Sequence, residues 1–597
     1  MKIKVLQRPA GILCVAVSIC VAAVTMSGAA QAASDVVSSS QHPGSGRTVG
    51  DIRSRITGAP ILGTSGWESI TNLQAAPSGL PSKSKQIKVL TKVLNFMTAN
   101  YESYSDYTPG PQDIFDYGIG SLWKQGIDGA GTTVAVIEGW DDPNIAQQIA
   151  SFDKIFGLPN PEIQTIFPSG DGKLPAKCPP GMVALGSYGS CKAWQGELQL
   201  DVMSVHLIAP YAKIVISATP ADSQITDDAA SQVAPPEMME ALEHISSGHL
   251  ANVISISDGT GESSYSEGTP EILAQDPGEL AAAAAGIPVV NATGDCGVVQ
   301  NLPAANGQCE DVSSTADVAT WDDSPWVTAV GGSVPNVSPV NGDSLGPDPL
   351  WHVSPPDAEY SENAGLSKVF ARPTYQNGVA SITGSDMRSL PDIVMDAQDG
   401  TSEAAPLFAG VLALATQVNG ANIGPINSVL YDDLGPAGST DGISDVVSGN
   451  ESAETPEGVV TVPGYTATTG FDIASGWGTI SAPNFVPSLV AATQAADEDA
   501  TVREQAASDL KTLETGIDLS NSDIPSNGSS TLSAGNFLPG HPVKLLIDGK
   551  LITTLTASSQ GMVSYVIEPS SLGLAPGAHT VKLKSMLLNQ SASFTVS

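Results

Sequence analysis

The sequence predicts an α/β domain, a parallel β-sheet covered by helices, followed by a small β-sandwich. Short apolar, β-branched runs alternate with helical stretches between residues 131 and 330, which is typical of a parallel sheet whose two faces are buried. From about Thr531, short strand-like runs are separated by Gly/Pro turns at a spacing typical of a β-sandwich.

The N-terminal residues predict export. Residues 1–32 have a basic start, an apolar core over Ile12–Met26 and the small-residue pattern Ala30-Gln31-Ala32 of a cleaved signal peptide. Residues 33–106 follow as a short prosegment, polar at first and then helical over Lys85–Tyr101. We expect a secreted, extracellular zymogen with no membrane association after signal removal, because no second long apolar run follows.

The predicted sheet lies in a catalytic domain over residues 107–487. Its expected strands are Gly131–Glu138, Lys213–Ala218, Val253–Ser257, Pro288–Ala292 and Val327–Val330, and its expected helices include Glu197–His206 and Glu237–His244. Residues 488–530 predict a helix over Leu489–Leu513 and then a Ser/Asn linker over Ser520–Ser530. Residues 531–597 predict an Ig-like β-sandwich with strands at Val543–Ile547, Leu551–Ala557, Val563–Ile567, His579–Leu583 and Ser591–Val596.

The net charge of the chain limits the classes of partner that we expect it to bind. There are 62 acidic residues against 25 Lys and Arg, a net charge of -37. Nucleic-acid binding is not expected, since no basic surplus exists to neutralise phosphates. The self-repulsion of such a chain at neutral pH is relieved as carboxylates protonate, which suits an acid environment. We also expect a monomer.

The cysteines predict disulfides, since an even number remains in an exported chain. Cys14 and Cys20 leave with the signal peptide. We favour the local pairs Cys178–Cys191 and Cys296–Cys309, although four cysteines allow three pairings. A thiol nucleophile at Cys296 is a weaker alternative, because no histidine is adjacent in the sequence.

Ser402 is the candidate nucleophile. It follows Gly400 and precedes an Ala/Leu/Val-rich run to about Gln417 that predicts a buried helix. At such a loop-to-helix junction, free backbone N–H groups favour the negative charge of an acyl-transfer intermediate. A helix N-cap is the alternative interpretation of the same serine.

Glu197 and Asp201 offer the base that a serine nucleophile needs. They are four residues apart, so they lie one turn apart on nearly the same helix face. Neighbouring carboxyl groups resist ionising together, which raises one pKa and gives a proton acceptor suited to acid. A solvated helix face explains the same pair. His206 lies about 180° around the helix from Glu197, so we expect it to be packed or exposed elsewhere.

Asp295 belongs to a third motif. The apolar run Ile287–Ala292 leads into Gly294-Asp295-Cys296-Gly297. In a parallel sheet, functional groups lie just past the carboxyl ends of strands, which makes Asp295 a candidate site residue. A turn aspartate is the alternative.

These three motifs, in this order, resemble those of the sedolisin family of serine-carboxyl peptidases. The resemblance extends over about Tyr107 to Pro487 and includes Gly400-Thr401-Ser402-x-x-x-Pro406. It implies a subtilisin-like fold with Ser402 as nucleophile, Glu197 as general base and Asp201 supporting Glu197. Asp295 is implied in the oxyanion hole, where it must be protonated, because a carboxylate would repel a developing oxyanion.

The resemblance also implies one structural Ca²⁺. Carboxylates come from Asp445 and Asp472, and main-chain carbonyls from Val446, Thr468 and Gly470, which are the oxygen ligands that calcium prefers. Thr468 stands where a glycine is more usual in the family. Two turn aspartates are the alternative.

Asp258 is a departure from the family pattern. It follows Ser255-Ile256-Ser257, where the family tends to carry an aromatic residue. A substrate contact and a turn aspartate both remain open for it.

The sequence therefore predicts a secreted, acid-acting endopeptidase that hydrolyses protein and peptide substrates. One alternative is a tripeptidyl exopeptidase, and another is an inactive binding or adhesion protein on the same scaffold. A subtilisin-type histidine triad is disfavoured, because none of the seven histidines lies in a His-Gly-Thr setting.

Overall fold

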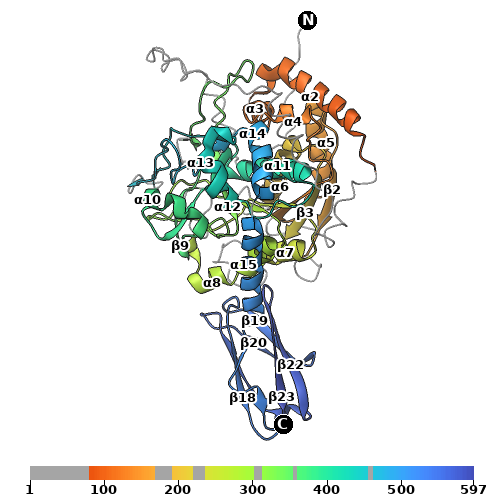
Figure 1. Cartoon of the computed structure of the whole chain (residues 1–597), viewed down its shortest axis with the longest axis vertical. Coiled ribbons are helices and arrows are strands. Elements are labelled where there is room, and N and C mark those ends of the chain that lie inside the picture. Colours follow the sequence, from red (N-terminus) through yellow and green to blue (C-terminus); the bar gives the residue numbers. More distant parts are fainter. Residues whose placement is uncertain are drawn as a thin grey trace.

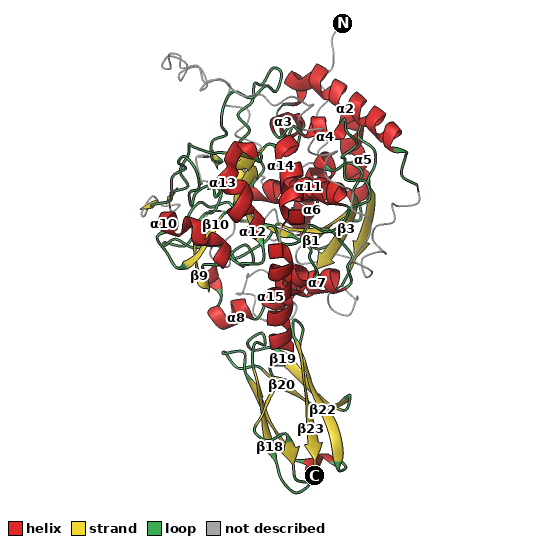
Figure 2. Ribbon diagram, viewed as in Figure 1, coloured by secondary structure: helices red, strands yellow, loops and turns green. Residues whose placement is uncertain are grey.

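The computed structural model describes residues 79–105, 107–168, 191–219, 235–301, 309, 312–353, 360–454, 461–495 and 497–597. The predicted signal peptide, residues 33–78 of the predicted prosegment and Cys178 lie outside these residues. A large part of helices and sheets and an elongated β part are joined by helix α15 (Asp497–Glu514) (Figures 1 and 2).

A seven-stranded sheet in the order β11-β6-β5-β4-β1-β3-β2 organises the large part. Every pairing in it is parallel, which confirms the predicted fold class. Its strands are β1 (Thr133–Gly139), β2 (Glu162–Ile166), β3 (Lys213–Thr219), β4 (Val253–Ile256), β5 (Val289–Ala292), β6 (Thr328–Ser333) and β11 (Ile393–Asp396).

Five of these strands match the predicted ones, and two were missed. β2 is a half-exposed edge strand that carries polar residues at alternate positions. β11 is a four-residue strand that follows Pro391 closely, so its apolar run is too short to stand out.

The two faces of the sheet bury different side chains of the same strand. In β1, Val134 and Val136 join the main hydrophobic cluster, whereas Ala135 and Ile137 join a second one. Helices α6 (Cys191–Ile208) and α11 (Thr401–Asn419) contribute to the first cluster, and α7 (Glu237–Ser247) and α9 (Asp276–Ala284) to the second. Coverage on both sides explains why the strands are apolar without alternation.

Helix α2 (Lys83–Tyr104) contains the expected helix Lys85–Tyr101 and belongs to the main core. Its buried side chains recur at helical spacing on one face, at Leu90, Val93, Leu94 and Met97. They lie in the same cluster as the sheet and as helices α3 (Pro111–Asp116), α4 (Ile119–Trp123) and α5 (Ile145–Phe156). Although α2 lies within the predicted prosegment, it packs as part of the large structural unit.

Loops with short elements complete the large part. They contain β7 (His352–Val353), β8 (Tyr360–Ser361), α8 (Thr269–Leu273), β9 (Gly365–Ala371), α10 (Ala380–Thr383), β10 (Met387–Leu390), α12 (Asn427–Val429), α13 (Gly435–Ala437), β12 (Ile443–Ser444), β13 (Ala453–Glu454), β14 (Thr461–Val462), β15 (Thr479–Ile480) and α14 (Ala482–Ala495).

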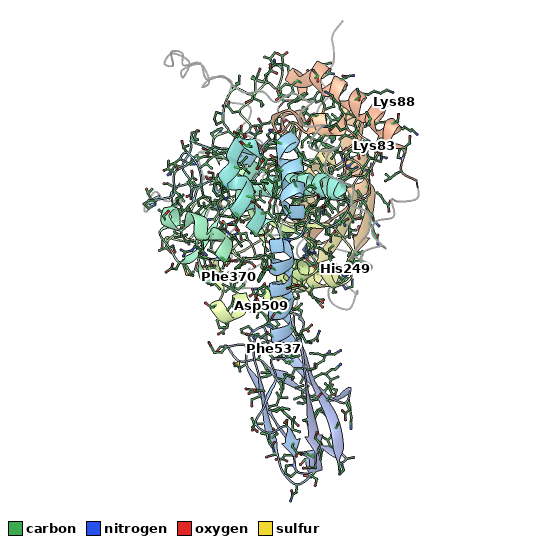
Figure 3. All side chains as sticks on the ribbon, viewed as in Figure 1. Lys83, Lys88, His249, Phe370, Asp509 and Phe537 are labelled. Carbon is green, nitrogen blue, oxygen red and sulfur yellow. A yellow bond between two sulfur atoms is a disulfide. The ribbon has the colours of Figure 1, made fainter. Side chains whose placement is uncertain are left out.

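The β part consists of two sheets that share one hydrophobic core, as predicted for a β-sandwich. Its sheets have the orders β16-β18-β21 and β17-β23-β22-β19-β20. Phe537 is buried in this core at the end nearest α15 (Figure 3). The elements are β16 (Asp518–Leu519), β17 (Asp523–Ile524), β18 (Ser530–Ala534), β19 (Pro542–Ile547), β20 (Lys550–Thr556), β21 (Val563–Ile567), α16 (Pro569–Leu572), β22 (Gly577–Lys584) and β23 (Asn589–Val596).

The predicted linker Ser520–Ser530 is wrong, because this segment is part of the sandwich. β17 lies within it and pairs in parallel with β23, and Ile524 is fully buried in the shared core. One buried isoleucine among polar residues is enough to hold this edge segment, and Ser/Asn-rich composition hides it.

The turn between β22 and β23 docks the β part against the large part. Leu587 is 7% exposed and lies in the second cluster with Met238, Leu242 and Trp321. The Gln590 amide also donates a hydrogen bond to the Leu513 carbonyl at the end of α15, at 2.8 Å. The sandwich is therefore held by packing as well as by its covalent connection.

We expect Leu587→Ala to lower the free energy of unfolding by about 2–4 kcal/mol, because it leaves a cavity in a packed cluster. Leu551→Ala is the matched control, since this leucine of β20 is 53% exposed. Guanidinium chloride unfolding followed by fluorescence compares the two. Equal effects would mean that the turn does not pack against the large part in solution.

Candidate active site

The candidate catalytic residues meet at the carboxyl edge of the sheet. Ser257 and Asp258 follow β4, Asp295 follows β5, and Ser402 lies in the first turn of α11, soon after β11. Glu197 reaches the same place from α6. This is the edge of a parallel sheet at which ligands usually bind.

Ser402 lies at the loop-to-helix junction that the sequence predicted. Its side chain is half-buried, between the fully buried Thr401 and Glu403. Gly400 precedes the helix with a φ of 93°, a left-handed conformation that favours glycine. A Cβ at Gly400 would lie 2.8 Å from Asp295 Oδ2, so a side chain there would also displace a candidate site residue.

Glu197 and Asp201 are buried neighbours on α6, and Glu197 is hydrogen-bonded to the Ser402 side chain. Burial raises the pKa of Glu197 well above its usual value, the nearby charge of Asp201 raises it further, and the bond with Ser402 opposes the rise. Glu197 and Ser402, which are far apart in the sequence, are thus in contact. Glu197 and Asp201 are buried and do not form a solvated helix face, and Gly400, not Ser402, is the N-cap of α11.

Glu138 and Ser257 extend the carboxyl system, and sequence reasoning missed both. The fully buried carboxyl of Glu138 lies close enough to that of Asp201 to share a proton with it, and Ser257 Oγ donates to Asp201 Oδ1 at 3.1 Å. Burial, and then the charge of Asp201, raise the pKa of Glu138 well above its usual value. A carboxylate near the end of an otherwise apolar strand was the signal that could have identified Glu138.

Asp295 is held against the start of α11. Its Oδ1 accepts hydrogen bonds from the Thr401 backbone N–H and from Thr401 Oγ1, both at 2.8 Å. The Asp295 carbonyl accepts from the Ser361 N–H at 2.9 Å, which fixes the turn. Its charge is close enough to Glu197 to contribute to the raised pKa of that residue.

The predicted disulfide Cys296–Cys309 is present and closes the loop directly after Asp295. It joins residues 13 positions apart, and both cysteines are buried. The other favoured pair, Cys178–Cys191, lies outside the described residues.

Asp258 is a half-buried residue beside the same carboxyl system. Its Oδ1 accepts from the Gly259 N–H at 2.8 Å, as a turn aspartate does, and its Oδ2 is buried without a hydrogen-bond partner. Burial raises its pKa to about 7. Its charge in turn raises the pKa values of Glu138 and Glu197.

His206 lies away from this group, as its helical position predicted. Its fully buried ring is hydrogen-bonded through Nε2 to Asp153 Oδ1 at 2.8 Å. It is a packed histidine of the interface between α5 and α6.

The predicted calcium ligands lie on two loops whose carboxylates approach each other. Asp445 Oδ2 accepts from the Gly470 N–H at 2.9 Å, and Asp472 Oδ2 accepts from the Thr468 N–H at 2.5 Å. Asp445 Oδ1 is buried without a hydrogen-bond partner. Burial and then the charge of Asp445 raise the pKa of Asp472. Two close carboxylates with an unpaired oxygen fit a site for an oxygen-seeking cation.

No family model matches the chain. Kumamolisin of Bacillus sp. is 26% identical over 422 residues, which cover 65% of this chain and 66% of kumamolisin. Sedolisin of Pseudomonas sp. is 27% identical over 372 residues, 59% of this chain and 56% of sedolisin. The solved structure of Pseudomonas sedolisin, a serine-carboxyl proteinase in complex with pseudo-iodotyrostatin, aligns with a TM-score of 0.48 at 24% identity, over 63% of this chain and 93% of that one.

The matched regions span less than two thirds of the length of these curated relatives. The chain is similar in sequence to peptidases of the sedolisin family.

Proposed function

We propose that the protein is a secreted, acid-acting endopeptidase of the serine-carboxyl type, with Ser402 as nucleophile. The observation that carries this proposal is the hydrogen bond between the Ser402 side chain and the buried Glu197 carboxyl. A serine hydroxyl becomes a competent nucleophile only when an adjacent group accepts its proton.

Glu197 accepts a proton and then donates it in each half of the reaction. Ser402 Oγ bonds to the carbonyl carbon of the peptide while its proton passes to Glu197. Glu197 then protonates the leaving amine as the C–N bond breaks, and an acyl-enzyme remains on Ser402. Water then attacks the ester carbonyl carbon while Glu197 takes a proton from it, and Glu197 passes this proton to Ser402 Oγ as the bond between Oγ and the acyl carbon breaks. Asp201 lies beside Glu197, and Glu138 lies beside Asp201. These two carboxyl groups orient Glu197 and share protons with it.

Asp295 completes the oxyanion site in its protonated form. Thr401 donates two hydrogen bonds to Oδ1, which leaves the carboxyl oriented so that a proton on its other oxygen serves as a donor. A donor of this kind typically stabilises the transition state by about 3 kcal/mol. An ionised Asp295 would repel the oxyanion, so activity requires acid.

Ser402→Ala should reduce casein hydrolysis near pH ~4 by about 10³-fold or more, and Glu197→Gln should be comparably damaging. His206→Gln is the control, because it keeps a hydrogen-bond donor for Asp153 outside the proposed site. It should retain most activity. Loss on changing His206, with survival on changing Glu197, would instead favour a histidine triad.

The length of the products separates the endopeptidase from the tripeptidyl alternative. We expect internal cleavage of an N-terminally blocked peptide, detected by mass spectrometry. Successive tripeptides released only from free N-termini would identify the exopeptidase, and no cleavage of either peptide would favour an inactive binding protein.

The stability of the protein should fall as the pH rises. The folded-state pKa of Asp258 is about 7, above its usual value of 3.8. Between these values the folded chain holds a proton that the unfolded chain has released, so this contribution to stability is complete below about pH 4 and is lost as the pH rises through 7. Other buried carboxyls, including Glu138 and Glu197, act in the same direction.

Urea unfolding midpoints measured from pH 4 to 8, in a Ser402→Ala background that prevents autolysis, should therefore decrease. Asp258→Asn should flatten the decrease, because an amide does not titrate, whereas Asp386→Asn, at a side chain 98% exposed, should not. A midpoint that rises with pH would contradict the burial of these carboxyl groups.

We propose further that the loops carrying Asp445 and Asp472 bind one structural Ca²⁺, with main-chain carbonyls of Val446, Thr468 and Gly470 as additional ligands. Bound calcium would neutralise the two carboxylates and hold the loops together. Asp445→Asn should lower the thermal midpoint at saturating calcium and weaken the effect of a chelator. Asp433→Asn, at an exposed aspartate outside these loops, should change neither.

A further inference from the structure

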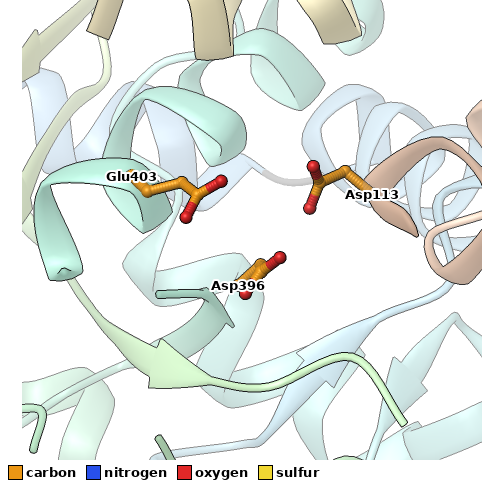
Figure 4. A group of neighbouring side chains, drawn as sticks. All are labelled: Asp113, Asp396 and Glu403. Atoms are coloured by element: carbon orange, nitrogen blue, oxygen red, sulfur yellow. The ribbon is translucent and has the colours of Figure 1, made fainter. Parts of the chain in front are cut away.

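A second group of buried carboxyls lies on the other side of the helix turn that carries Ser402. Asp113 comes from α3, Asp396 from the end of β11, and Glu403 from the first turn of α11. All three are 0% exposed, and one carboxylate oxygen of each lies within 4.8 Å of those of the other two. Figure 4 shows the three carboxyl groups pointing toward one another.

Two oxygens in this group have no hydrogen-bond partner, Asp113 Oδ1 and Glu403 Oε1. Their second oxygens are satisfied locally, by the Gly110 N–H at 2.7 Å and by the Asp399 N–H at 3.0 Å. The Asp396 carboxyl accepts from the Gln398 backbone and side chain, each at 3.1 Å. Unpaired buried carboxylate oxygens are costly, so they point to a partner that the neighbouring side chains do not supply.

Among the residues that the structure describes, no Lys, Arg or His side chain forms an ion pair with the group. The ion pairs among the described residues include none of Asp113, Asp396 and Glu403. Further acidic side chains face it instead, with Asp116 acting on Asp113 and Asp399 on Glu403. The neighbouring Tyr117 hydroxyl accepts a hydrogen bond from the Asp396 N–H at 2.5 Å.

A shared proton can provide a partner for some carboxylate oxygens of this group, but not for all of them. The carboxyl groups of Asp113 and Asp396 lie close enough to share a proton, but this proton would leave Glu403 Oε1 without a partner. A hydrogen bond through a shared proton joins two oxygens about 2.6 Å apart and reaches no third carboxylate. Asp113 and Asp396 act on Glu403 through charge. A cation, in contrast, attracts all three carboxylates at once.

We propose that Asp113, Asp396 and Glu403 bind a divalent cation, and that the cation is Ca²⁺. Calcium binds oxygens at about 2.3–2.6 Å, so ligands on opposite sides of it lie about 4.6–5.2 Å apart and adjacent ligands are closer. The three carboxylate oxygens lie within 4.8 Å of one another, so one ion could contact all of them. Calcium accepts about six to eight oxygens in a flexible arrangement, whereas magnesium keeps several waters and usually binds only one or two carboxylates, so three buried carboxylates favour calcium.

The ion would join three segments that are distant in the sequence. It would tie the start of α3 and the end of β11 to the first turn of α11, one residue after Ser402. This site is separate from the loops of Asp445 and Asp472, and it does not depend on the proposed peptidase activity.

The number of calcium ions bound per chain tests the proposal. The full-length Ser402→Ala protein is stripped with a chelator and dialysed against ⁴⁵Ca²⁺ at pH 8. The double variant Asp113→Asn/Glu403→Gln, made in this background, should bind one ion fewer per chain than its parent. Both substitutions keep the side-chain shape and remove the charge that holds the ion.

Asp445→Asn in the same background is the matched control, since it leaves the buried carboxyl group intact. We expect this chain to retain one ion, and the combination of all three substitutions to bind none. The proposal is overturned if the double variant binds as many ions as its parent. It is equally overturned if the Asp445→Asn chain binds no calcium, a result that does not require the double variant to fold.

Discussion

The contact between helices α6 and α11 is the constraint on which the rest of the site depends. A Cβ at Gly410 of α11 would lie only 2.7 Å from Ile208 Cβ of α6 and 3.3 Å from the Val205 carbonyl, so the two helices approach closely because this residue has no side chain. The close approach lets Glu197 reach Ser402. Both helices also pack on the same face of the sheet, which fixes their position relative to each other.

Carboxyl groups on both sides of the Ser402 turn are buried with few cations to balance them. Burial raises the pKa values of Glu138, Glu197 and Asp201, which favours their neutral forms and lets these neighbouring carboxyl groups share protons. Asp113, Asp396 and Glu403 face the same cost, and a proton shared between Asp113 and Asp396 does not reach Glu403 Oε1. The same physical problem has two solutions in one protein, a network of protons at the proposed catalytic centre and, by our inference, a cation beneath it.

The β part shows how composition and packing can disagree. A Ser/Asn-rich segment predicts a flexible linker, yet β17 pairs within it, and the turn carrying Leu587 enters a cluster formed by α7 and α9. Helix α2, at the N-terminal end of the described chain, is a second example. It precedes the predicted catalytic domain, yet its apolar face lies in the main core. Both ends of the described chain are therefore integrated with the sheet.

The sequence by itself determined the parallel α/β class, most strands of the sheet, the β-sandwich and the residues Glu197, Asp201, Asp295 and Ser402 as candidates, because hydrophobic periodicity and motif spacing are local properties. The roles of those residues remain proposals. Only the tertiary structure decided that Ser402 contacts Glu197, that Glu138 and Ser257 stand behind Asp201, and that Asp113, Asp396 and Glu403 converge. Each of these contacts joins side chains from different helices and strands. Burial in the folded chain, which no local pattern contains, sets their charge states.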